Sequence, residues 1–138
     1  MNAKELMIGD WVINTEGKEQ IRDVVRKISP EFLGLRYSRR YVPIECIEPI
    51  PLTPELLVAN GFKKEIVGHV TKNGISDFPL YSLNENIRLE YPKGQVLTII
   101  GNDKNDIFIN KHIQYVHQLQ HAFRMLQYDD LADNFKVI

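Results

Sequence analysis

A proline-rich connector constrains the fold of this chain more than any other feature of its sequence. Residues 48–52 read Glu-Pro-Ile-Pro-Leu. Two prolines at alternate positions hold the backbone extended and disfavour both a helix and a central strand. The chain has 138 residues, so each side of the connector has room for one small lobe, and two large domains are excluded. We therefore expect residues 1–52 to form one region and residues 53–138 a second, compact one, with a core shared between them.

Turn-forming residues divide the first region into short strands. We expect about five of them, at Ile8–Asn14, Gln20–Ile28, Phe32–Tyr37, Tyr41–Ile44 and Cys46–Ile47. The apolar positions of the second strand do not alternate cleanly, which indicates a β-bulge. So many short strands in about fifty residues favour a small, strongly bent SH3-like β-barrel.

The region after the connector mixes helices and strands. Thr53 is the expected N-cap of a two-turn helix, with Pro54 at its first position and Gly61 as its left-handed stop. From Lys63 to Asn110 turn markers separate short strands in the pattern of an antiparallel meander, closed by a strand at Ile107–Ile109. The predicted fold class of the whole chain is therefore α+β.

A second helix is expected from about Asn110 to Gln127, and it is amphipathic. Its apolar positions fall on one side and are expected to pack on the sheet: Tyr115, Val116, Leu119, Ala122, Phe123 and Leu126. The opposite side carries polar residues that are expected to face solvent or a partner: Gln114, His117, Gln120, His121 and Arg124. Residues from Leu131 to Ile138 are expected to form a frayed tail or a short edge strand.

Charge and apolar content limit the function classes. The 17 basic and 18 acidic residues give a net charge of −1, so any binding of nucleic acid must be local. No apolar run approaches the roughly 20 residues that cross a bilayer, and the first residues lack the apolar segment of a secretory signal. With a single cysteine, Cys46, no internal disulfide can form. We expect a soluble, cytoplasmic protein without a membrane partner.

Three stretches resemble a known group of proteins. They are E-L-x-I-G-x-x-V at Glu5–Val12, P-I-P-L-T-P-E at Pro49–Glu55 followed by N-G-F, and Y-V-H-Q-L-Q at Tyr115–Gln120. Together they resemble an uncharacterised family of short proteins encoded in Bacteroidetes genomes, many of them in phages and other mobile elements. The resemblance implies no activity. The chain departs from it at Asp10 and His121, where the family pattern has Asn.

His117 and His121 are the one pair of residues with metal-ligand spacing. Four residues apart on a helix, their rings point the same way and can share a Zn, Ni or Cu ion. No glutamate lies between Ile113 and Ile138 to act as a base, and the fixed charge of Arg124 on the same face disfavours a cation. A solvated or partner-facing polar face is the favoured interpretation, and a metal site the alternative.

The sequence contains no recognisable catalytic machinery. Cys46 lies between acidic neighbours, which disfavour the thiolate that a nucleophile requires. No nucleophile elbow and no phosphate-binding glycine loop is present, and acidic residues such as Asp103 and Asp106 lack the spacing of a calcium loop. We expect no cofactor, and the lack of such machinery favours a non-enzymatic protein while leaving a metal-dependent enzyme as the alternative.

A basic stretch with interleaved aromatics is the strongest candidate for a ligand site. Between positions 22 and 40 six basic residues stand against two acidic ones, a local net charge of +4. Cations and aromatics along one groove can stack on nucleic-acid bases or on a protein segment. The competing interpretation is that the aromatics fill the core and the charges are solvated. The candidate ligand-binding residues are Trp11, Arg22, Arg26, Arg36, Tyr37, Arg39, Arg40 and Tyr41.

Three functional hypotheses follow from these patterns. The leading one is a non-enzymatic accessory or interaction module, of a phage or mobile element, that binds nucleic acid or a protein segment. The second is a metal-binding protein or metal-dependent enzyme that uses His117 and His121. The third is a homo-oligomeric assembly subunit in which the polar face of the C-terminal helix packs against a second copy.

Overall fold

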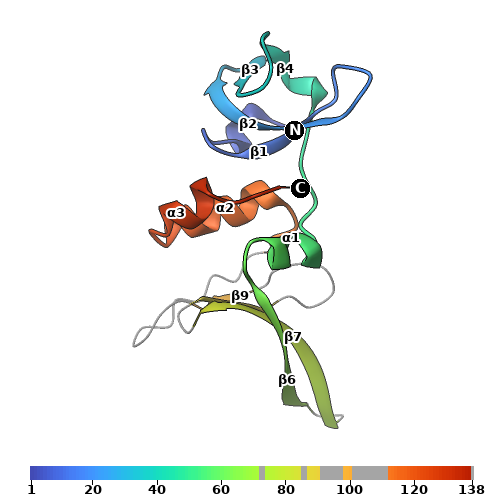
Figure 1. Ribbon diagram of the computed structural model, residues 1–138, viewed down its shortest axis with the longest axis vertical. Helices are drawn as coiled ribbons and strands as arrows, with labels where there is room; N and C mark the ends of the chain where they lie inside the picture. Colours follow the sequence, from blue (N-terminus) through green and yellow to red (C-terminus); the bar gives the residue numbers. More distant parts are fainter. Residues whose placement is uncertain (72–73, 85–86, 91–97, 101–111, 138) are drawn as a thin grey trace. The chain divides into compact units, whose positions relative to one another are not determined.

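The computed structural model describes residues 1–71, 74–84, 87–90, 98–100 and 112–137 (Figure 1). They form two compact units of α+β structure, as the sequence predicts for the fold class. The first unit comprises Met1–Pro51 and Tyr115–Val137, and the second Leu52–Gln114. This division differs from the expected one because residues 115–137 belong to the first unit and Leu52 to the second.

The first unit contains a five-stranded antiparallel sheet, which confirms the predicted number of strands. The strands lie in the order β4-β3-β2-β1-β5. A shift of register between Val25 and Lys27 confirms the predicted bulge. The bounds are β1 Trp11–Asn14, β2 Ile21–Ile28, β3 Phe32–Leu35, β4 Val42–Pro43 and β5 Ile47–Glu48, with short 3-10 turns η1 at Ala3–Glu5 and η2 at Ile44–Cys46.

The predicted SH3-like barrel is wrong, because this sheet stays open. Its two edge strands pair with one neighbour each, β4 with β3 and β5 with β1. Both edge strands are only two residues long, and η2 takes up the three residues between them. Among the described residues no sheet closes into a barrel.

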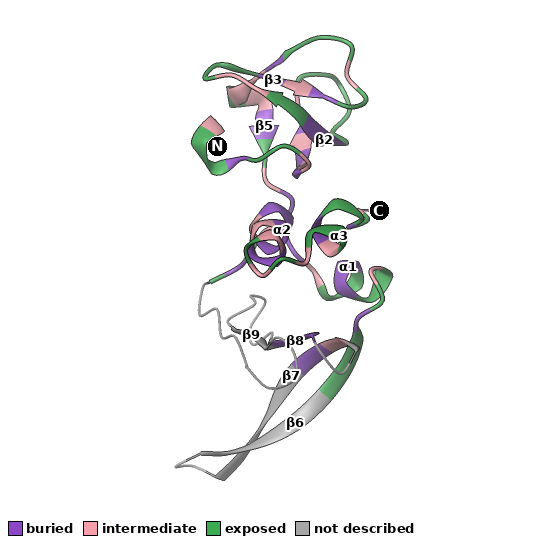
Figure 2. Ribbon diagram, turned by 90° about the vertical axis from the view of Figure 1, so that its left-hand side faces the viewer, coloured by how far each residue is buried: buried purple, intermediate pink, exposed green. Residues whose placement is uncertain are grey.

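Alternation along the strands directs one side of each into the core of this unit. Val12 is fully buried, whereas its neighbours Trp11 and Ile13 point the other way and are half-buried. Figure 2 colours these strands by burial, and β2 and β5 each carry buried positions. The buried cluster consists of Leu6, Val12, Val25, Leu33, Leu35, Val42 and Ile47.

Two helices complete the first unit. Helix α2 spans Val116–Met125 and α3 spans Asp129–Asp133. The start of α2 lies later than predicted because Tyr115 has extended φ and ψ and bridges to Pro51. Gln127 has a positive φ of 66°, which breaks the helical conformation between α2 and α3. The expected tail or edge strand is thus partly helical.

The second unit begins with helix α1, Pro54–Ala59, as predicted. The Thr53 hydroxyl accepts a hydrogen bond from the Leu56 amide at 3.2 Å, and Gly61 follows with φ +90°. Leu56 and Phe62 are buried, which a helix this short requires.

An antiparallel meander follows α1 in the second unit. Its strand order β6-β7-β8-β9 confirms the predicted sheet. The expected strand at Ile107–Ile109 and the acidic residues Asp103 and Asp106 lie outside the described residues. The bounds are β6 Lys63–Thr71, β7 Gly74–Asn84, β8 Ile87–Glu90 and β9 Thr98–Ile100.

Candidate functional site: an exposed surface of cations and aromatic rings

Three large aromatic side chains are exposed on one stretch of the first unit. Phe32 on β3 is 43% exposed, Tyr37 just after β3 is 63% exposed, and Tyr41 just before β4 is 56% exposed. The register that pairs Leu33 with Val42 brings Phe32 and Tyr41 to the same hairpin. Single exposed aromatics are common, but three between positions 32 and 41, two of them lining one hollow, are a recurring mark of binding surfaces.

Cations accompany two of these rings. The Lys27 ammonium lies 5.6 Å from the centre of the Tyr41 ring and donates a hydrogen bond to its hydroxyl at 3.2 Å. The Arg36 guanidinium lies 5.9 Å from the centre of the Tyr37 ring. Arg39 and Arg40 are exposed in the turn between them. We call this set the cationic aromatic surface: Lys27, Phe32, Arg36, Tyr37, Arg39, Arg40 and Tyr41.

A glycine leaves room for the Tyr41 ring to lie against the sheet. A β-carbon on Gly34 would come within 3.4 Å of Tyr41 Cε1 and 3.1 Å of Lys27 Cβ. Beside this ring is a hollow of about 440 Å³ lined by Lys27, Ser29, Phe32 and Tyr41. Because two rings line it, the hollow can accept a flat group.

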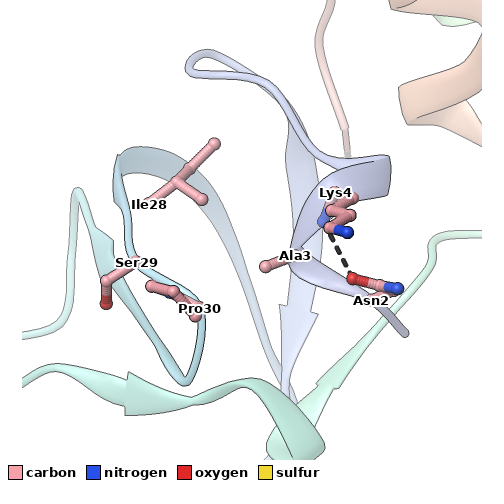
Figure 3. A pocket seen from close by; sticks show the side chains of 6 residues that line it. All are labelled: Asn2, Ala3, Lys4, Ile28, Ser29 and Pro30. Carbon is pink, nitrogen blue, oxygen red and sulfur yellow. Dashed lines mark hydrogen bonds between the residues drawn. The ribbon is translucent and has the colours of Figure 1, made fainter.

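A second hollow, of about 290 Å³, also has Ser29 in its lining (Figure 3). Ala3, Ile28 and Pro30 give it an apolar lining, and Asn2, Lys4 and Ser29 complete it. Ser29 lines both hollows, so they flank the same turn between β2 and β3.

The buried carboxylate of Asp23 holds the turn that presents the arginines. It accepts hydrogen bonds from the Tyr37 amide at 2.9 Å and from the Ser38 hydroxyl at 2.9 Å. The Asn14 side chain donates in turn to Ser38 at 3.3 Å. Since Asp23 is fully buried and engaged with the backbone, it offers a ligand no exposed negative charge.

The predicted ligand-binding residues do not all lie together. Five of the eight belong to the cationic aromatic surface, and Arg22 and Arg26 are exposed elsewhere on β2. Trp11 does not belong to it: its indole nitrogen donates to the Phe135 carbonyl at 2.7 Å, next to α3. Lys27 and Phe32 complete the surface.

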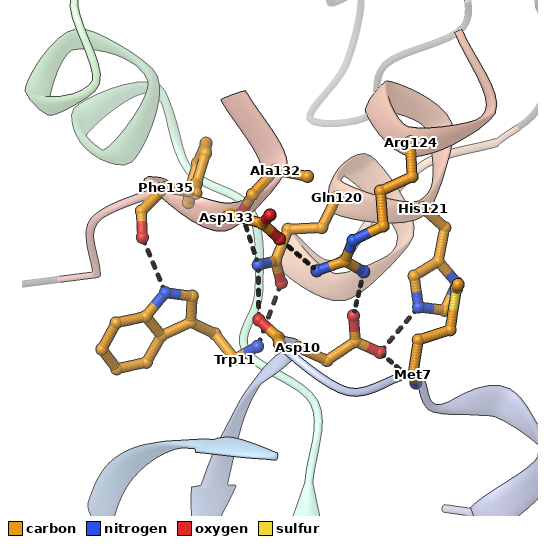
Figure 4. A network of polar contacts seen from close by, with 10 residues as sticks. Met7, Asp10, Trp11, Gln120, His121, Arg124, Ala132, Asp133 and Phe135 are labelled. Carbon is orange, nitrogen blue, oxygen red and sulfur yellow. Dashed lines mark hydrogen bonds and ion pairs between the residues drawn. The ribbon is translucent and has the colours of Figure 1, made fainter. Parts of the chain in front are cut away.

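The second cluster of polar residues centres on Asp10, which is fully buried (Figure 4). Its carboxylate lies 2.6 Å from His121 Nε2 and 2.8 Å from Arg124 Nη1, both on α2. The Met7 amide donates to the same carboxylate at 2.7 Å. We call Asp10, His121, Arg124 and Gln120 the Asp10 cluster.

Gln120 uses its whole side-chain amide to join α2 to the start of β1 and to α3. Its oxygen accepts from the Trp11 amide at 3.0 Å, and its nitrogen donates to the carbonyls of Gly9 at 3.0 Å and Ala132 at 2.9 Å. Gly9 has φ +96°, and a β-carbon there would lie 2.8 Å from Arg124 Nη2. The site therefore requires glycine for both conformation and space.

The expectation of a solvated polar face on the C-terminal helix is thus wrong. Gln120 is 0% exposed and His117 4% exposed, whereas Gln114 is exposed as expected. Gln120 binds the chain's own backbone, and His121 and Arg124 bind Asp10. The hypothesis of a homo-oligomer assigned the same polar face of this helix to contacts with a second copy.

The metal hypothesis has little support in this geometry. His121 Nε2, which a metal ion would need as a ligand, already contacts the Asp10 carboxylate. The His117 and His121 rings meet edge-to-face, with their centroids 5.7 Å apart. Within the described residues no group of three or more His, Cys, Asp or Glu is placed to hold a metal ion.

Burial lowers the pKa of His117, and the nearby charge of Asp10 opposes this.

Sequence reasoning missed Asp10 as the partner of the helix. One signal for a buried carboxylate partner was available in the sequence. His121 and Arg124 are three residues apart, next to Gln120, and such hydrogen-bond donors on one helix face bind a carboxylate better than a cation. The two positions that depart from the family resemblance, Asp10 and His121, are in contact with each other.

No helix among the described residues combines the length and apolar character that spanning a membrane would need. Comparison with protein-family models, with curated proteins and with solved structures gives no match.

Proposed function

We propose that the chain is a non-enzymatic binding module that holds single-stranded nucleic acid on the cationic aromatic surface. The observation that carries the proposal is the exposure of Phe32, Tyr37 and Tyr41, two of which lie beside a cation. Exposed rings of this kind have no role in the core and are suited to stacking on bases. The family resemblance adds a setting, an accessory role in a phage or other mobile element.

The charges on this surface favour a polyanion over an uncharged protein segment. Lys27, Arg36, Arg39 and Arg40 surround the rings, and the nearby Asp23 is buried and already paired. A duplex keeps its bases stacked inside, so rings that stack favour single strands. Both features are matched by a flexible strand with phosphates and unstacked bases.

The test is binding of fluorescently labelled single-stranded DNA and RNA, measured by anisotropy between 50 and 200 mM salt. With four phosphate contacts and a slope near −0.7 per contact, affinity should fall by about 50-fold over this range. Arg39→Ala with Arg40→Ala should weaken binding and reduce the slope by about 1.4.

The matched control is Lys63→Ala with Lys64→Ala, which removes two exposed positive charges from the second unit. It changes the net charge by the same amount, so it should leave binding nearly unchanged. Equal losses in both double variants would point to non-specific charge attraction and contradict the proposed surface. Tight binding of a protein segment, with no binding of any oligonucleotide at 50 mM salt, would assign the surface to a protein partner instead.

A further inference from the structure

We infer that the hollow lined by Lys27, Ser29, Phe32 and Tyr41 is a subsite for one guanine base of a bound single strand. This inference rests on the proposed function and adds base selectivity to it. The hollow is lined by two exposed rings, Phe32, on which a base can stack, and Tyr41, whose hydroxyl can meet the edge of that base. Its rim carries three polar groups, Lys27 Nζ, Tyr41 Oη and Ser29 Oγ, whose hydrogen-bonding roles follow from their contacts.

The hydrogen bond between Lys27 and Tyr41 determines what the rim can donate. Lys27 Nζ donates one of its three hydrogens to Tyr41 Oη at 3.2 Å and keeps two others. Because Tyr41 Oη is the acceptor in that contact, its own hydrogen remains able to donate outward. The rim therefore presents two adjacent donors.

Ser29 has the opposite role. Its hydroxyl donates to the Phe32 carbonyl at 2.8 Å, so it retains only lone pairs for a ligand. The hollow thus combines two neighbouring donors with one acceptor. The base that fits it must carry two neighbouring acceptors and, elsewhere on its edge, a donor.

Guanine meets this requirement through O6 and N7, the pair of acceptors that lysine and arginine side chains also recognise in duplex DNA. Adenine presents a donor, its N6 amino group, next to N7. Cytosine also carries two neighbouring acceptors, O2 and N3, and an amino donor, but the two fused rings of guanine offer a larger face for stacking on Phe32. These features together select guanine.

The experiment uses the full chain and oligothymidine strands with one variable central base: dG, 7-deaza-dG, dA or dC. We expect the dG strand to bind about five- to tenfold more tightly than the dA strand, the lower end of what a paired donor contact achieves. The 7-deaza-dG strand, which lacks the N7 acceptor, should lose most of this preference. Equal affinity for all four strands, or a preference for dC, would overturn the inference and leave the proposed function standing.

Two variants connect the preference to the hollow. Tyr41→Phe keeps the ring and removes the hydroxyl, so the ratio of the dG affinity to the 7-deaza-dG affinity should approach one in this variant, whatever its overall affinity. Tyr128→Phe makes the same chemical change on a ring just before α3, outside the cationic aromatic surface, and should keep the full dG preference. A preference that survives Tyr41→Phe unchanged would contradict the assigned subsite. Absence of binding to every strand at 50 mM salt would overturn the proposed function and the guanine subsite together.

Discussion

The Asp10 cluster and the cationic aromatic surface use similar side chains for opposite purposes. Both belong to the first unit, and both combine arginine with aromatic or imidazole rings and a buried aspartate. In the Asp10 cluster the chain itself supplies every partner of the carboxylate, within 2.6–2.8 Å. On the cationic aromatic surface the buried Asp23 holds only the backbone turn, and the rings remain 43–63% exposed.

This difference separates stability from binding. A buried polar group that is fully paired fixes one arrangement of the elements around it, and removal of one partner leaves another group buried without compensation. An exposed ring beside a cation contributes little to folding and remains available to a ligand. Substitutions in the two regions should therefore affect different measurements.

The largest effect is expected from Asp10→Ala. The change leaves the guanidinium of Arg124 buried without its carboxylate, so the free energy of unfolding should fall by about 3–5 kcal/mol. Chemical denaturation followed by circular dichroism measures this change. Asp133→Ala is the control, because Asp133 is 63% exposed and lies 3.6 Å from Arg124, and it should cost less than about 1 kcal/mol. Equal costs for the two variants would show that the cluster does not stabilise the fold.

Gln120→Leu should have the next largest effect on stability. It keeps the approximate size of the side chain but leaves the Trp11 amide and the Gly9 and Ala132 carbonyls without their partner. We expect a loss of about 2–3 kcal/mol in the same denaturation experiment. A neutral result would mean that other groups or water satisfy these three backbone atoms.

Arg36→Ala combined with Tyr37→Ala should show the reverse pattern. Both side chains are exposed and contact each other, so the free energy of unfolding should change by less than about 0.5 kcal/mol. Loss of one stacking ring and one cation should weaken oligonucleotide binding about tenfold or more. If the double variant unfolds easily and binds normally, the contrast between the two regions is incorrect.

Local patterns in the sequence predicted the strands and the first helix well. The bulge in β2 and the Thr53 cap both depend on residues close together in the chain, and both are confirmed. Barrel closure was predicted wrongly because it depends on whether two distant edge strands meet. The Asp10 cluster was missed for a related reason: it joins positions about 110 residues apart, and helical projection reveals which residues share a face but not what that face contacts.

The candidate surface could be predicted only in part from composition. The run of arginines and tyrosines from 36 to 41 supplies five of the seven residues of the cationic aromatic surface, and all five are exposed, because a turn with this content is exposed almost wherever it occurs. Trp11 has the same composition signature, an aromatic ring in a region rich in cations, but its indole donates to the Phe135 carbonyl. Strand alternation alone could not show that Trp11 faces α3 instead.

The smallest effect, and the sharpest test of how tightly the polar side of α2 is buried, concerns pH. Burial lowers the pKa of His117 below its usual value near 6.5. The charges of Asp10 and Glu5 raise this pKa and His121 lowers it further, but burial is the largest effect. The unfolded chain therefore binds a proton at His117 more readily than the folded chain does, and this contribution to stability is complete above about pH 6.5 and is lost as the pH falls below it.

His117→Leu replaces a side chain whose buried Nδ1 makes no hydrogen bond, so the variant should fold while losing this part of the pH dependence. The free energy of unfolding is obtained from denaturation curves at a series of pH values from 8 to 5. Plotted against pH, it should run parallel for the two proteins above neutrality. Below about pH 6.5 the wild type should lose stability more steeply than the variant. Curves that stay parallel over the whole range would mean that solvent reaches the His117 ring in the folded chain.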